Sequence, residues 1–168
     1  MRARFGVALL AAGLLLAGCG GSDEPKTMSK AQFVVEGDVV CAKLSDRFAR
    51  AGATDPQTPQ QTAEAANVLA DLYDELRRGL QDIRLPDDRA ERSGAVAYVA
   101  AIRRTDTTLE ALRGSAQRFV AAADVGEPRE LTQAGNAVRT ALDEFRAAQA
   151  NADRRAIDYG FDYCGNLD

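Results

Sequence analysis

Apolar residues in this chain recur at spacings of three and four, in four separate stretches between residues 29 and 160. Side chains at these spacings share one face of an α-helix, so each stretch predicts an amphipathic helix with one buried side. No stretch alternates apolar and polar residues as a half-buried strand does; even the pair Val39-Val40 fits the helical stripe better. The spacing therefore predicts an all-α fold.

Capping and turn residues set the expected helix limits. Ser29 with Gln32 forms a capping box, Gly52 suits the C′ position of the first helix, and Leu85-Pro86 should end the second. The expected helices cover residues 29–52, 58–85, 87–124 and 128–160. Helices joined by short connections pack antiparallel, so we expect an up-down-up-down four-helix bundle.

The chain contains no histidine, which excludes Ser-His-Asp and Cys-His nucleophile systems as well as His-ligated zinc. Carboxylates are plentiful, but no metal-binding loop, glycine-rich phosphate loop or nucleophile elbow occurs. The net charge of −4 offers no attraction to a phosphate backbone. We therefore expect no enzyme, no catalytic residue, no metal, no cofactor and no nucleic-acid partner.

The N-terminus has the layout of a secretory signal. A short basic segment, Met1 to Arg4, precedes an apolar run from Phe5 to Leu16 that is too short to span a membrane. The last residue of this run and the three residues after it, Leu16-Ala17-Gly18-Cys19, resemble the lipobox of bacterial lipoproteins. An ordinary cleaved signal that contains a cysteine is the alternative, but Gly18-Cys19 stands where cleavage must fall.

The resemblance implies cleavage before Cys19, a diacylglyceryl group on its sulfur, and usually acylation of the new amino terminus. Radioactive palmitate is the label that would report these acyl groups. The expected divisions are a signal peptide over 1–18, a lipidated flexible tether over 19–28 and the bundle domain over 29–168. The resemblance places the protein at the extracytoplasmic face of the cell membrane, held there by lipid. Beyond the leader, the chain looks like the small helical secreted lipoproteins of bacteria, a likeness that implies no site.

Two cysteines, Cys41 and Cys164, remain for the domain. In an exported protein they predict a disulfide that joins the C-terminal tail to the first helix. Closing a loop of roughly 120 residues contributes about 4–5 kcal/mol in the chain-entropy model. The rival interpretation, a free redox or metal-binding pair, lacks both CxxC spacing and histidine.

The inward glycines Gly37, Gly94 and Gly135 each cost about 1 kcal/mol against alanine in a helix, so we expect a packing reason for them. Gly37 and Gly94 fall near the end of the bundle that adjoins the tether. The tail brings to this end the residues Asp158, Tyr159, Phe161, Asp162 and Tyr163. The favoured interpretation has Phe161 filling the space that the glycines leave. The alternative is a small membrane-proximal cleft that binds a ligand or partner.

Three hypotheses for function follow. The preferred one is a non-enzymatic interaction, scaffold or accessory module with a protein partner in the cell envelope, which predicts a solid core and an exposed apolar patch. The second is a ligand-binding lipoprotein, which predicts a cavity of a few hundred cubic ångströms with mixed lining. The third is an enzyme, which predicts a cleft with carboxylates of shifted pKa. The oligomeric state stays open.

Overall fold

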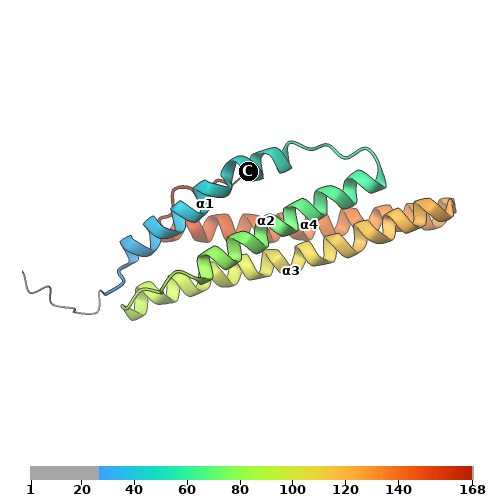
Figure 1. Ribbon diagram of the computed structural model, residues 1–168. Helices are drawn as coiled ribbons and strands as arrows, with labels where there is room; N and C mark the ends of the chain where they lie inside the picture. The colour runs from blue at the N-terminus through green and yellow to red at the C-terminus, as the bar shows by residue number, and fades with distance from the viewer. Residues whose placement is uncertain (1–26, 168) are drawn as a thin grey trace, which may run out of the picture.

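The computed structural model describes residues 27–167, which are all-helical and contain no strand (Figure 1). The helices are α1 (Lys30–Gly52), α2 (Pro59–Gln81), α3 (Arg89–Val125) and α4 (Pro128–Tyr159). The prediction of an all-α helical bundle is confirmed. The leader, Cys19 and most of the tether lie outside the described residues.

Local capping chemistry explains most of the helix limits. The Ser29 side chain accepts a hydrogen bond from the Gln32 amide, and the Gln32 side-chain oxygen accepts one from the Ser29 amide, which completes the expected capping box. Asp88 caps α3 by accepting from the amides of Ala90 and Glu91. Gly160 ends α4 with a φ of 103°, a conformation that glycine adopts without strain.

Two helix ends differ from the expectation. Gly52 is the last helical residue of α1 and not a left-handed C′ residue, because Ala53 closes the helix in the right-handed conformation. The second helix, α2, ends at Gln81 and does not continue to Leu85. The connection after Gln81 instead meets the start of α1. There the Asp87 amide donates a hydrogen bond to the Met28 carbonyl at 2.9 Å, and the Met28 amide donates one to the Asp87 carboxylate at 2.8 Å.

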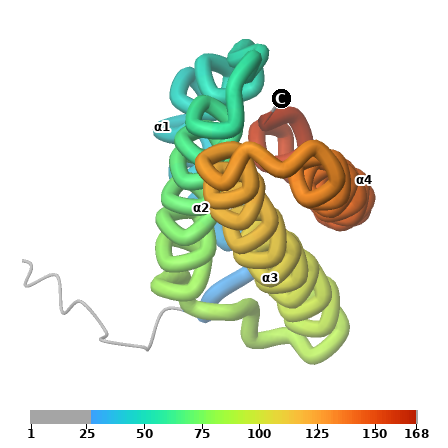
Figure 2. Tube along the Cα trace, turned by 90° about the vertical axis from the view of Figure 1, so that its right-hand side faces the viewer, coloured from blue at the N-terminus to red at the C-terminus, as the bar shows by residue number. Residues whose placement is uncertain are grey.

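Consecutive helices make the main contacts in the domain: α3 packs most extensively against α4, then against α2, and α2 packs against α1. Three aromatic rings in edge-to-face contact, those of Phe48, Tyr73 and Phe145, join α1, α2 and α4 across the core. In Figures 1 and 2 the C-terminal segment lies between α1 and α4. The chain after Gly160 thus occupies part of the space where a fourth helix would contact the first.

The predicted disulfide between Cys41 and Cys164 is confirmed, with an S–S distance of 1.96 Å. The Asp38 carboxylate, one turn earlier on α1, accepts hydrogen bonds from the amides of Asp162 (3.0 Å), Tyr163 (2.8 Å) and Cys164 (3.3 Å). This carboxylate satisfies the amides of a segment that has no regular secondary structure to pair with. We call residues 160–167, fastened by these contacts, the C-terminal strap.

Phe161 of the strap is 3% exposed, and its neighbour Tyr163 is 55% exposed. We predict that Phe161→Ala lowers the free energy of unfolding by about 3 kcal/mol, because it empties a buried aromatic site. Tyr163→Ala, two residues away, should change it by less than about 0.5 kcal/mol. Chemical denaturation of both variants with the disulfide intact provides the measurement. Equal losses would mean that the strap is stabilised by its backbone contacts and not by the ring of Phe161.

Candidate functional site

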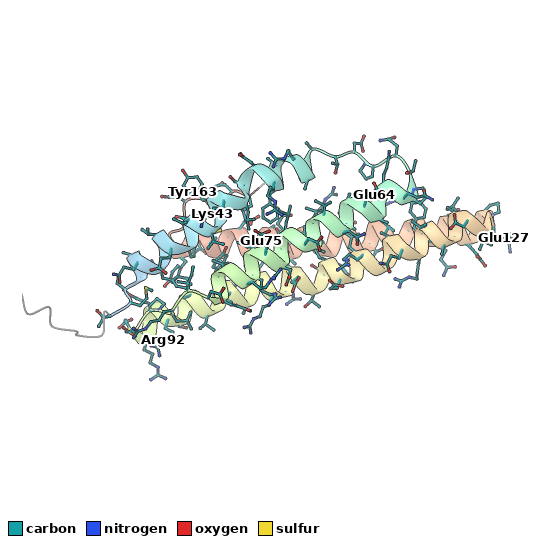
Figure 3. All side chains as sticks on the ribbon, in the orientation of Figure 1. Lys43, Glu64, Glu75, Arg92, Glu127 and Tyr163 are labelled. Carbon is teal, nitrogen blue, oxygen red and sulfur yellow. A yellow bond between two sulfur atoms is a disulfide. The ribbon has the colours of Figure 1, made fainter. Side chains whose placement is uncertain are left out.

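The five residues predicted to gather near the tether end divide into two groups. Tyr159 and Phe161 are buried, whereas Asp158, Asp162 and Tyr163 are exposed, and Tyr163 projects from the strap beside α1 (Figure 3). The Tyr159 hydroxyl donates to the Glu91 carbonyl at 3.0 Å, and the ammonium of Lys30 lies 4.9 Å from the centre of the Tyr159 ring. The ring of Tyr159 is therefore tied to α1 and α3.

Both inward glycines near the tether end have a packing reason. A Cβ atom at Gly37 would lie 2.5 Å from Cε1 of Phe161, and one at Gly94 would lie 2.6 Å from the Tyr159 ring. The interpretation that Phe161 fills this space is confirmed beside Gly37, whereas the ring of Tyr159 fills the space beside Gly94. Gly135 differs, since a Cβ there would make only ordinary contact with Phe119 at 3.5 Å.

The ring of Tyr98 packs 4.8 Å from that of Phe161, centre to centre, at the middle of this cluster. Its hydroxyl is buried and has no hydrogen-bond partner among residues 27–167, and burial raises the pKa of this phenol far above its usual range. Burial, with the nearby Glu91 charge, also raises the pKa of Tyr159. At the corner before α3, the hydrogen bond from the Met28 amide lowers the pKa of Asp87, with help from the charges of Arg84 and Arg92.

A cleft does exist, at the opposite end of α1. It has a volume of about 450 Å³ and is bordered by the last turns of α1, the connection to α2, all three other helices and the end of the strap. We call it the distal cleft. Its apolar lining comprises Phe48, Ala51, Pro56, Ala65, Ala66, Leu69, Tyr73, Leu112, Val138, Leu142, Phe145 and Leu167, and its polar lining Thr54, Asp55, Thr62, Arg146 and Gln149.

The distal cleft exists because α1 and the strap do not extend along the whole of α3 and α4. Figure 1 shows the end of α1 and the connection after it standing away from the other helices, above the part of α2 that carries Glu64 (labelled in Figure 3). The inward stripes of α3 and α4 are buried beside the strap. Beyond it five of their apolar positions are only half-buried: Phe119, Ala123, Leu131, Val138 and Leu142.

The chemistry of the distal cleft varies along its length. Phe145 meets Tyr73 at 5.7 Å between ring centres, so the Arg146 and Gln149 side chains border the aromatic end of the cleft. Thr54, Asp55 and Thr62 border the other end, near the start of α2. The middle is aliphatic. Such an arrangement can bind an elongated apolar group and contact it with polar side chains at either end.

No local pattern in the sequence predicts the distal cleft, although the expected helices differ in length. The expected first helix was much shorter than the expected third, so part of the third and fourth helices had to lack a partner. Asp38 was also missed, because its hydrogen bonds join residues 124 to 126 positions apart. No local pattern marks a carboxylate that accepts from so distant a segment.

No protein-family model, no curated protein and no solved structure matches this chain. Between residues 27 and 167, no helix is apolar over a sufficient length to cross a membrane. In the same range, no group of three or more cysteine and carboxylate side chains is placed to hold a metal ion. Function must therefore be argued from the distal cleft and from the leader.

Tyr98 provides a test of the packed end. We predict that Tyr98→Phe raises the free energy of unfolding by about 1 kcal/mol, because the phenylalanine buries the same ring without an unpaired hydroxyl. Tyr159→Phe serves as the matched variant and should lower it by about 1 kcal/mol through loss of the bond to the Glu91 carbonyl. Urea denaturation distinguishes them. A loss in both variants would show that the Tyr98 hydroxyl has a partner, such as a buried water.

Proposed function

We propose that this chain is a membrane-anchored extracytoplasmic lipoprotein and that its domain is a non-enzymatic binding module whose site is the distal cleft. The observation that carries the binding role is the cleft itself, whose volume of about 450 Å³ lies within the usual range of roughly 300–1,000 Å³ for ligand sites. Its lining combines an aliphatic middle with a few polar side chains at the ends, as such sites do.

The lipobox-like leader supports the anchored location. The domain is also tied down where the tether reaches it: Met28 bonds to Asp87, and the Lys30 amide donates to the Glu91 carboxylate at 2.9 Å. Phe48 follows Lys30 by eighteen residues, so the distal cleft begins about 27 Å along α1 from the tethered end. Anchoring and binding would therefore use different ends of the domain.

The distal cleft favours the ligand-binding hypothesis over the scaffold hypothesis. Large exposed apolar side chains occur on every helix and on the strap. α3 carries two of them, Val96 and Val125, and α1 carries two, Val35 and Val39. Dispersed valines of this kind are normal on a protein surface and define no contiguous patch. A protein partner in the cell envelope stays a second possibility for the outer face of α1, where these two valines are one turn apart.

We also propose that the helices follow the up-down-up-down order. The connections between helices are short, and each helix has its chain neighbour as a main packing partner. In a closed bundle of this order α1 and α4 would pack directly against each other. Under this proposal the strap lies between them over part of their length, and the distal cleft is the part that the strap does not fill.

Lipid attachment is tested by metabolic labelling. We predict that the wild-type chain incorporates radioactive palmitate and that Cys19→Ala does not, because Cys19 supplies the thiol that receives the lipid. A Ser22→Ala variant in the tether is the matched control and should label as the wild type does. An unlabelled wild type, or a labelled Cys19→Ala variant, would contradict the lipoprotein assignment.

Binding in the distal cleft is tested with a local reporter, since the chain contains no tryptophan. We predict that Thr62→Trp, at the border of the cleft, changes its emission when the neutral probe N-phenyl-1-naphthylamine is added to the full chain in lipid nanodiscs. Val96→Trp, on the exposed side of α3, is the control variant, and its emission responds only to probe that is dissolved in the membrane. The same response from both variants, or none from either, would contradict a binding role for the cleft.

A further inference from the structure

The shape of the distal cleft limits what it can hold. On α4 its lining extends from Val138 to Gln149, and on α2 from Thr62 to Tyr73, which is eleven residue steps on each wall. At 1.5 Å per residue both walls are about 16 Å long. The distal cleft is therefore elongated along the helices.

The shape and lining of the distal cleft indicate the kind of occupant. A single extended hydrocarbon chain is roughly 4–5 Å across at carbon–carbon contact distances, and it fits lengthwise in an elongated cleft. The aliphatic residues along the middle, among them Leu69, Val138 and Leu142, would remove such a chain from water.

The charges at the two ends give the occupant a direction. Arg146 stands at the aromatic end with a side chain that is 67% exposed, and its contact with Asp143 is long, at 3.9 Å. Its guanidinium is therefore available for a carboxylate, which it binds with two parallel hydrogen bonds, and the Gln149 amide nearby supplies a further donor. Asp55 at the other end repels an anion.

We propose that the distal cleft binds a free fatty carboxylate, with the acyl chain along the aliphatic middle and the carboxylate on Arg146. This inference rests on the proposed function and adds to it the chemical class of the ligand. Walls of about 16 Å match the length of a long-chain fatty acid, and the terminal methyl group of this acid would lie beside Thr54 and Thr62.

The experiment uses palmitic acid that carries a photoreactive diazirine, and the methyl ester of the same acid as a neutral probe. Each is added to the full lipidated chain in membranes and illuminated, and the labelled peptides are identified by mass spectrometry. We expect the acid to label peptides that contain Leu69 and Leu142. In Arg146→Gln this labelling should fall about tenfold, as loss of a charged hydrogen-bond pair predicts.

Three controls make the outcome decisive. Arg139→Gln removes an exposed arginine of α4 outside the cleft and should leave labelling unchanged. Labelling by the methyl ester should be the same in Arg146→Gln as in the wild type, because the ester has no charge to lose. Ala65→Phe, which places a ring in the cleft, should reduce labelling by both probes.

The two proposals fail in different ways. If acid and ester label the cleft equally and Arg146→Gln has no effect, the fatty carboxylate is wrong while the cleft stays a binding site for apolar groups. If neither probe labels the cleft, the acyl ligand is wrong, and the emission of Thr62→Trp with the naphthylamine probe then decides the proposed function separately. Labelling of the cleft by a diacyl phospholipid analogue in preference to the free acid would also overturn the inference.

Discussion

The insertion of Phe161 against Gly37, beneath the disulfide between Cys41 and Cys164, is the contact on which the arrangement of α1 depends. α1 packs against only one other helix to any extent, α2. Lys30 at its start also contacts Glu91 and the Tyr159 ring. The middle of α1 is held by the eight residues that follow α4, through the buried Phe161 ring, the Asp38 carboxylate and the disulfide. Without that segment, α1 would pack against α2 on one face and would be exposed to water on the other.

These attachments are unevenly distributed along α1, and this has consequences for local stability. The contacts of α1 with the strap and with the start of α3 fall between Met28 and Cys41, whereas only Leu44 and Phe48 of α1 are buried after that point. Two further hollows, besides the distal cleft, border Ala51 and Thr54. Segments with few buried contacts open at lower free energy than the rest of a domain. The last turns of α1, which form one wall of the distal cleft, belong to this class.

What the sequence revealed depends on how far apart the interacting residues are. The four helices, the capping box at Ser29 and the left-handed Gly160 follow from residues within a few positions of each other, and they were predictable. The disulfide was predictable because only two cysteines remained for it, and Phe161 because the inward Gly37 needed a bulky neighbour. The early end of α2 was not predictable in this way, and the connection after it is held by hydrogen bonds between Asp87 and Met28, 59 residues apart. The distal cleft was not predictable either, because its position depends on where several helices and connections lie relative to one another.

The two ends of the domain show opposite solutions to the same geometric problem, a first helix that is shorter than the helices it should cover. At the N-terminal end of α1, glycines at positions 37 and 94 let the rings of Phe161 and Tyr159 approach the backbone, and the space is full. At the far end the space is open, and Leu167 of the strap forms one of its walls. The connection between α1 and α2 beside this space carries the polar residues Thr54, Asp55 and Gln57. A protein gains stability by burying apolar surface, so leaving Val138 and Leu142 half-exposed beside a polar connection is costly unless something else covers them. Under the proposed function, a bound ligand covers them, and the stability that the free domain lacks becomes part of the free energy of binding.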